Sequence, residues 1–177
     1  MRKHLLAISA LLTTLFLIGC FEDLTDDLSI EIQATPSKLV EATIGTQTTF
    51  TESGSFDLTD DEDLKEYLER LENLKISHLD IVVETAPEVS AEVTSGFASI
   101  VLPSGNALSV SLNGFKLEVG NKVTFDQVEE LEEIAETLLV DKHFDFELGG
   151  EVSEPNITFQ LKIIAFATAT AQTGGND

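Results

Sequence analysis

The sequence predicts a mainly β protein, an antiparallel β-sandwich of about eight strands with two amphipathic α-helices. Three observations support this fold class: apolar and polar residues alternate in many short segments, turn-forming residues separate those segments, and two stretches carry apolar residues at helical spacing instead. Strands joined by short turns pair antiparallel, and eight suffice for two stacked sheets. The length of 177 residues favours a single domain, and a hydrophobic content of 42% is enough for a packed core.

A period of two residues supports the strand prediction. Residues 48–58 place large apolar side chains on one face and Thr, Ser or Asp on the other. After Gly114 the apolar positions change parity, which predicts a bulge or bend there. Gly120-Asn121 favours a two-residue hairpin between neighbouring strands, and the last strand is expected from Ile157 to about Ala171.

Two segments show helical spacing instead. The first helix is expected to begin near Thr59 and Glu62, which have the spacing of a capping box. Its apolar stripe is Leu64, Leu68, Leu71 and Leu74. The stripe of the second helix is Val128, Leu131, Ala135, Leu138 and Leu139. Both stripes predict helices that cover the core with one face.

The surroundings of the two helices resemble each other. Phe56-Asp57 precedes the first helix, and His78-Leu79-Asp80 follows it. Phe125-Asp126 and His143-Phe144-Asp145 stand in the same places around the second. We interpret the pattern as a degenerate internal repeat of strand, helix and strand. Coincidence is the alternative, because the two copies share few identities.

The charge balance excludes one class of function. The chain has 32 Asp and Glu against 10 Lys and Arg, a formal net charge of −22. Nucleic-acid binding requires clustered basic residues that neutralise phosphates. The sequence therefore predicts no nucleic-acid partner.

The amino terminus has the pattern of an export signal. Arg2, Lys3 and His4 precede fourteen mostly apolar residues, 5–18, which are too few to span a bilayer as a helix. The apolar stretch ends in Leu17-Ile18-Gly19-Cys20, and Cys20 is the only cysteine of the chain. An ordinary secretory signal with a chance cysteine is the alternative interpretation.

This string resembles the lipobox of bacterial lipoproteins. The resemblance implies cleavage before Cys20 and attachment of a diacylglycerol to its sulfur. Phe21 stands where an Asp would signal retention in the inner membrane, and four acids follow within residues 22–27, as in surface-exported lipoproteins of the Bacteroidota, whose small members the chain resembles. The expected location is the outer membrane, on the periplasmic or the outer side.

The predicted organisation is a signal peptide over 1–19, a lipidated Cys20 with an acidic tether over 20–27, a single sandwich domain over 28–172, and a flexible tail over 173–177. Removal of residues 1–19 takes away two bases and no acid, which leaves a more acidic body. Because anionic head groups repel such a body, membrane contact is expected through the acyl chains on Cys20 alone.

Two His-x-Asp pairs are the candidates for chemistry. His78 with Asp80 and His143 with Asp145 could each present an imidazole and a carboxylate on one strand face, and together they could bind a metal. The opposite face of each strand carries large apolar residues, so side chains on a wet sheet face are the preferred interpretation. The acids at 57 and 60–63 are explained by a helix start, with calcium binding as the alternative.

The sequence therefore predicts a non-enzymatic protein without a cofactor, with a binding or structural role at the cell envelope. It contains no Gly-x-Ser-x-Gly motif and no Gly-rich phosphate loop. Two alternatives stay open: a carrier of an apolar ligand in a cavity under the two helices, and a hydrolase or metal protein that uses the His-x-Asp pairs. The protein or small-molecule partner is left open.

Overall fold

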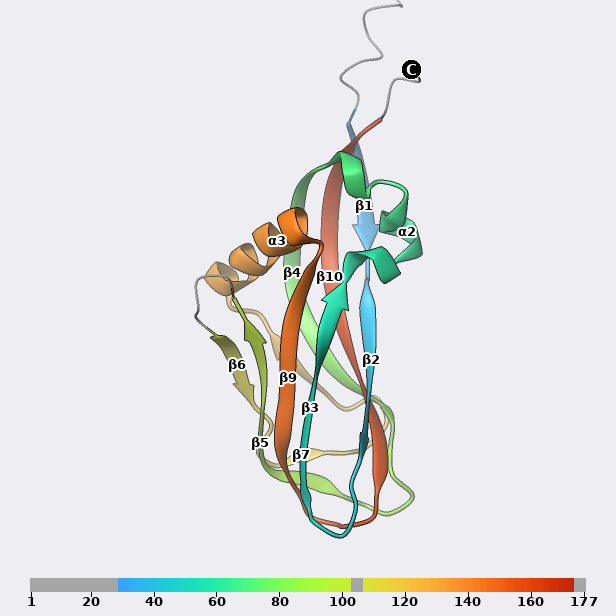
Figure 1. Ribbon diagram of the computed structural model, residues 1–177, viewed down its shortest axis with the longest axis vertical. Helices are drawn as coiled ribbons and strands as arrows, with labels where there is room; N and C mark the ends of the chain where they lie inside the picture. Colours follow the sequence, from blue (N-terminus) through green and yellow to red (C-terminus); the bar gives the residue numbers. More distant parts are fainter. Residues whose placement is uncertain (1–28, 103–106, 174–177) are drawn as a thin grey trace, which may run out of the picture.

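The computed structural model describes residues 29–102 and 107–173, which form two five-stranded antiparallel sheets packed face to face (Figure 1). The expected signal peptide, Cys20 and the acidic tether lie outside these residues, as do residues 174–177 of the expected tail. None of the helices in the described part has the length and the apolar run that crossing a bilayer requires.

The strands of the first sheet follow the order β1-β10-β4-β8, and β2 also pairs with β10. Their bounds are β1 Ser29–Ala34, β2 Ser37–Thr43, β4 Leu71–Thr85, β8 Lys122–Phe125 and β10 Thr158–Gln172. The second sheet follows the order β3-β9-β5-β6, and β7 also pairs with β5. Its strands are β3 Thr49–Asp57, β5 Glu92–Val101, β6 Ala107–Ser111, β7 Phe115–Lys116 and β9 His143–Val152.

The described residues form ten strands, where the sequence predicted about eight. One extra strand arises because β1 and β2 pair with the two halves of β10 on either side of Pro36, which has no N–H to donate to a ladder. The strand expected before Gly120 is present as β7, but it is only two residues long. With β1 and β2 taken as one interrupted strand, the strand order of the two antiparallel sheets is that of a double-sheet jelly roll.

The prediction of two amphipathic helices is wrong for the first. The chain there forms α2, only Glu62–Lys65, between the 3₁₀ turns Leu58–Asp60 and Leu68–Arg70. Leu71 already begins β4, and Leu74 pairs with Ala169 of β10. β10 is fifteen residues long, and β4 matches it with fifteen. Long-range pairing with β10 thus overrides the local leucine spacing.

The second predicted helix is confirmed as α3, Val128–Asp141. It buries Leu131, Ile134, Ala135 and Leu138 and packs against β4 and β9. It ends at Lys142, which adopts a left-handed conformation (φ 65°) and donates its N–H to the carbonyl of Leu138 at 3.1 Å. In Figure 1, α3 covers one side of the sandwich where the chain crosses from β8 to β9.

The two glycine turns behave differently from the prediction. Gly114 has φ 72° and lies in a turn between β6 and β7, so the parity change is a bend between two strands. The hairpin expected at Gly120-Asn121 does not form. Gly120 does turn the chain (φ 82°), but β7 pairs with β5 in one sheet and β8 with β4 in the other. The turn therefore carries the chain between the sheets.

The proposed repeat units pair with each other. Phe56 lies opposite Phe144 in the β3–β9 ladder, and Phe125 lies opposite Leu79 in the β4–β8 ladder. The two pairings fall at equivalent positions of the aligned units, because Leu79 of the first unit corresponds to Phe144 of the second. The jelly-roll topology places the units in this way. The two crossovers differ, since only the second contains a full helix.

The core fills the space between the sheets. Phe56 and Phe144 stack at 4.8 Å within the second sheet, and Phe50 contacts Phe159 of the first sheet edge-on at 5.6 Å. A pocket between the sheets, lined by Leu79 and Phe146 among others, measures about 10 Å³, which is about the space of a single water probe. The interior at this point is solid.

Candidate functional site

The first His-x-Asp pair lies on the outer face of the first sheet. His78 stacks on Phe166 of β10, with ring centroids 4.2 Å apart, and its Nδ1 is 2.9 Å from the Ser77 hydroxyl. Asp80 is only 2% exposed. Its carboxylate accepts hydrogen bonds from Lys122 Nζ at 2.7 Å and from Thr124 Oγ1 at 2.5 Å.

The surroundings of Asp80 keep it ionised. Burial alone would raise the pKa of this carboxyl, but the hydrogen bonds from Lys122 and Thr124 and the charges of Lys122 and His78 outweigh burial and lower the pKa. Both carboxylate oxygens are thus engaged by neighbours on β8. Asp80 therefore forms a structural ion pair, and its carboxylate is not free to bind a metal ion.

The second pair lies on the other sheet. His143 and Asp145 are exposed on β9, and His143 Nδ1 is 2.9 Å from the carbonyl oxygen of Asp141. The two His-x-Asp pairs occupy the outer faces of opposite sheets, so the fold does not bring them together. Within the described residues, no group of three or more His, Cys, Asp or Glu side chains is placed to hold a metal ion.

Two of the acids that precede α2 cap backbone groups. The Asp57 carboxylate accepts from the N–H of Thr59 at 2.7 Å, and Asp61 accepts from the N–H of Leu64 at 2.9 Å. The hydrogen bonds from the Thr59 hydroxyl and N–H lower the pKa of Asp57. Asp60 lies 3.4 Å from Lys38 Nζ. These contacts support the helix-start interpretation of the acidic run.

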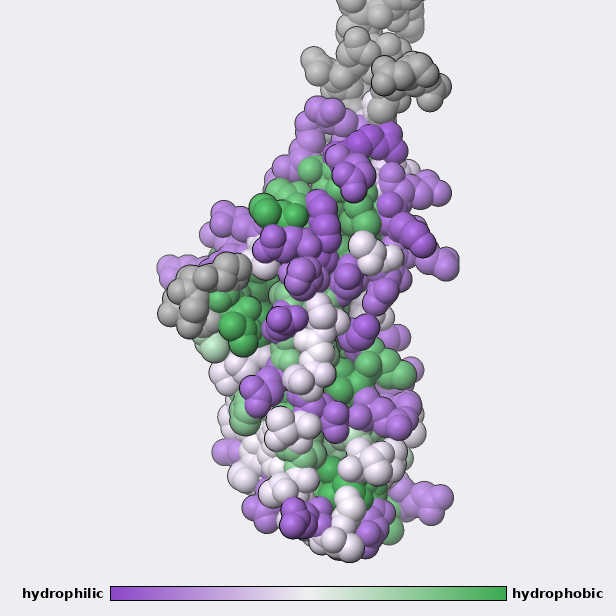
Figure 2. All heavy atoms as spheres, viewed as in Figure 1, coloured by the Kyte–Doolittle hydropathy of each residue, from purple (hydrophilic) through white to green (hydrophobic). Residues whose placement is uncertain are grey.

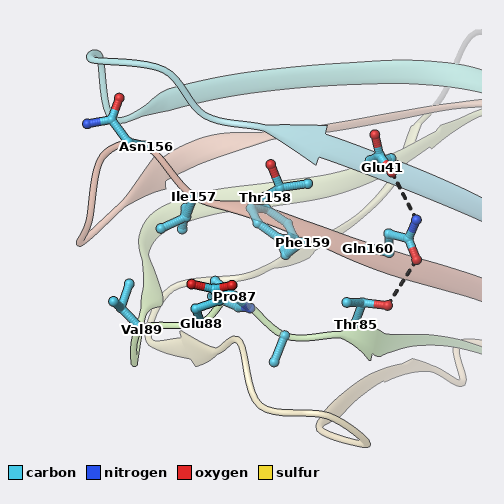
Figure 3. Close-up of a pocket in the computed structure, with 11 residues that line it drawn as sticks. Glu41, Thr85, Pro87, Glu88, Val89, Asn156, Ile157, Thr158, Phe159 and Gln160 are labelled. Carbon is cyan, nitrogen blue, oxygen red and sulfur yellow. Dashed lines mark hydrogen bonds between the residues drawn. The ribbon is translucent and has the colours of Figure 1, made fainter.

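A pocket that was not expected from the sequence lies at the end of the sandwich away from β1. It is about 510 Å³ in volume and lies between β2, β10, the end of β4 and residues 86–89 that follow it (Figure 3). Ile157 and Phe159 are buried and contribute apolar surface, and Val89 is half exposed at the rim. Figure 3 shows Glu88 and Val89 facing Ile157 across the pocket.

A chain of hydrogen bonds crosses three strands at this pocket. Thr85 Oγ1 donates to Gln160 Oε1 at 2.9 Å, and Gln160 Nε2 donates to Glu41 Oε2 at 2.9 Å (Figure 3). Glu41 and Glu88 are the charged residues of the lining, and none of the eleven lining residues is Lys, Arg or His. The pocket therefore suits a ligand that donates hydrogen bonds or carries positive charge, and it disfavours an anion.

Sequence reasoning missed this pocket because its parts come from distant segments. Glu41, Thr85 and Gln160 are brought together only by the pairing of β10 with β2 and with β4. The signal that was present is the polar Gln160 on a strand that is otherwise rich in apolar residues. That signal does not identify its partners.

No family model matches the chain, and no curated protein is significantly similar to it in sequence. Solved structures with a similar arrangement include proteins of viruses. A decameric BFDV capsid protein is 10% identical with a TM-score of 0.45, and the match covers 79% of this chain and 99% of that one. A structure of Desmodium yellow mottle tymovirus is 12% identical with a TM-score of 0.37, and the match covers 82% of this chain and 92% of that one. A structure of tobacco necrosis virus is 8% identical with a TM-score of 0.38, and the match covers 81% of this chain and 83% of that one. All these TM-scores are below 0.5, so they assign neither a family nor a function.

Proposed function

We propose that this protein is a lipid-anchored lipoprotein of the bacterial outer membrane, with a non-enzymatic binding or structural role at the cell envelope. The observation that carries the proposal is the order of basic start, short apolar stretch, Gly19 and Cys20 at the amino terminus. Two or more acyl chains on Cys20 would anchor the protein stably, since each buried methylene contributes about 0.8 kcal/mol.

The arrangement of the sandwich fits a tether at one end. Ser29, the first residue of β1, pairs with Gln172 near the end of β10, so both ends of the described chain lie at one end of the molecule (Figure 1). Figure 2 shows hydrophilic residues gathered at that end. A hydrophilic end favours attachment through the acyl chains alone.

The pocket at Gln160 lies at the opposite end. β10 runs fifteen residues from Thr158 to Gln172, which corresponds to about 48 Å at 3.4 Å per residue. A protein anchored through Cys20 would therefore hold this pocket away from the bilayer. The position and the hydrogen-bonding groups of the pocket favour a binding role over a purely structural one.

The two alternatives receive less support. A carrier of an apolar ligand requires an apolar cavity of several hundred Å³ under the two helices, and the first of these helices is only four residues long. The space of about 630 Å³ beside α3 is lined partly by Lys75, Glu132 and Glu136, and the pocket between the sheets measures about 10 Å³. A hydrolase that uses both His-x-Asp pairs requires convergent side chains, and these pairs lie on opposite sheets.

Expression of the full chain in a bacterium that processes lipoproteins, with an alkyne fatty acid in the medium, tests the anchor. The wild-type protein should incorporate the label and fractionate with outer membranes. Cys20→Ser should lose the label and leave the membrane fraction, whereas Gly45→Ala, a change at an open position far from the amino terminus, should behave like wild type. An unmodified thiol on the purified native protein would overturn the proposal.

A further inference from the structure

β4 has an open edge along its first half. β10 pairs with β4 over nearly its whole length, whereas β8 covers the other side only from Leu79 to Val82. Within the described residues no other strand pairs with β4. Residues 71–78 therefore have backbone groups without a neighbouring strand on the side away from β10.

The helix α3 turns this edge into a groove of about 630 Å³. One wall is the β4 segment Asn73–Ser77, and the other is one face of α3. Val128, Leu131 and Ala135 supply the apolar part of that face, and Val128 is 68% exposed. Figure 1 shows α3 alongside this part of β4. A strand placed in the groove would continue the line of β8.

The strand register shows which backbone N–H and C=O groups of β4 face the groove. Ala165 of β10 donates its N–H to Pro36, away from β4. By alternation Ala167 and Ala169 also direct their backbone groups away from β4, and their partners there are Ile76 and Leu74. The N–H and C=O groups of Leu74 and Ile76 consequently face the groove.

The charges on α3 determine which kind of segment could bind in the groove. The helix carries five Glu residues and a terminal Asp with no base, and Glu132 and Glu136 line the groove without an ion-pair partner in the described structure. These carboxylates would repel the acidic residues 20–27 of this chain, and a second copy would bring its own net charge of −22. A basic segment is complementary instead.

The alternation of side chains along a strand also predicts the sequence pattern of the bound segment. Residues opposite Leu74 and Ile76 would point toward α3, where the aliphatic stem of Lys or Arg covers Val128 and Ala135 and its charge reaches Glu132 or Glu136. The intervening residues would lie on the outer surface beside the exposed Lys75, which disfavours a base there. Asn73–Ser77 offers about 14 Å, enough for four or five extended residues.

We propose that the groove between β4 and α3 binds an extended segment of a partner protein as an added β-strand, with Lys or Arg at every second position facing α3. The inference gives a partner class to the binding role proposed above and rests on that role. It does not depend on the lipid anchor, because it uses only β4 and α3.

Fluorescence anisotropy with the labelled peptide Thr-Lys-Thr-Arg-Thr-Lys-Thr and the full-length protein in mild detergent tests it. Binding should saturate at low salt and weaken at least tenfold in 0.5 M NaCl. N-methylation of the basic residues, which removes the donors facing Leu74 and Ile76, should abolish binding. N-methylation of the threonines should leave it within twofold. A peptide with Glu in place of Lys and Arg should not bind.

Matched protein variants locate the site. Val128→Arg and the pair Glu132→Gln with Glu136→Gln should each weaken binding at least tenfold. Val140→Arg, at a valine of α3 that is 76% exposed outside the groove, and Glu129→Gln with Glu130→Gln should leave it within twofold. Thermal melts confirm that the variants fold.

The results separate this proposal from the other occupants and from the anchor. No binding by the basic peptide, equal losses in the control variants, or insensitivity to N-methylation would each overturn the added strand. Concentration-dependent dimerisation that Val128→Arg abolishes would assign the groove to a second copy and likewise overturn it. Cys20→Ser protein should bind the peptide normally, so failure of the anchor and failure of the groove are distinguishable.

Discussion

Asp80 and Asp145 occupy equivalent positions after the two crossovers, yet their surroundings differ. Asp80 is covered by β8, whose Lys122 and Thr124 both donate to it. Asp145 is exposed on β9 opposite Ser55. A buried carboxylate is stabilised only where donors replace the water that it loses. The same sequence motif therefore produces an ion pair in one sheet and a solvated carboxylate in the other.

Replacing Asp80 by Ala should destabilise the protein by about 1–3 kcal/mol, because the Thr124 hydroxyl loses its acceptor and Lys122 its partner. The matched control is Asp145→Ala, which should change the free energy of unfolding by less than about 0.5 kcal/mol. Urea unfolding followed by circular dichroism measures both. Equal effects of the two substitutions would show that the Asp80 contacts contribute nothing specific.

At the scale of elements, the sequence predicted those parts of the fold that local periodicity determines. The alternation in β3 and the full length of β10 were correctly inferred, and so was α3, because one face of each is buried. The first leucine stripe led to a wrong helix prediction because its last two members, Leu71 and Leu74, already belong to β4. From Leu74 onward buried residues alternate with exposed Asn73, Lys75 and Ser77, and that period of two was the overlooked signal.

The sites depended on pairing that local patterns do not contain. The two His-x-Asp pairs were correctly placed on strands, but which sheet each strand joins follows from the topology. The groove beside β4 exists because β8 is only four residues long and α3 begins soon after it. Neither the length of a partner strand nor its register is encoded in the pattern of a single segment.

The β5–β9 ladder contains a close approach that only glycine permits. A Cβ atom on Gly150 would overlap the carbonyl oxygen of Ser95 and lie 2.8 Å from the Cα of Gly96. Both contacts are with backbone, at the register shift between Val93 and Ser95. The irregularity in β5 and the glycine in β9 therefore fit each other.

Gly150→Ala should lower the free energy of unfolding by about 2–4 kcal/mol, because the two strands must separate to admit the methyl group. Gly45→Ala is the control: nothing lies within 4 Å of the new Cβ, and a change within about 0.5 kcal/mol is expected. Differential scanning calorimetry of the two variants measures the difference. An unchanged melting temperature for Gly150→Ala would mean that the β5–β9 ladder adjusts without cost.

The whole molecule is organised around β10, which pairs with β1, β2 and β4 and links the two ends of the sandwich. The side chains on its inner face become smaller toward the end where α2 packs near β1, where they are alanines at positions 165, 167, 169 and 171. One strand therefore connects the end where the tether would attach with the pocket at Gln160. A ligand in the pocket would contact β2 and β4, and an added strand would pair with β4; both of these strands pair with β10.

Acid titration of the whole molecule combines two effects of opposite sign. Protonation of its 32 carboxylates relieves repulsion and stabilises the fold. Asp80 contributes in the other direction, because its pKa is lower in the folded state. The unfolded chain then binds more protons, so the contribution is complete above the ordinary pKa of about 3.9 and is lost as the pH falls through the lower folded value.

Comparison of wild type with Asp80→Asn isolates this contribution, since the other carboxylates cancel. The difference in the free energy of unfolding should be constant from pH 7 to about pH 5 and should shrink as the pH approaches 3. Urea unfolding at pH 3, 4, 5 and 7 measures it. A difference that grew on acidification would mean that burial, rather than the donors on β8, determines the pKa of Asp80.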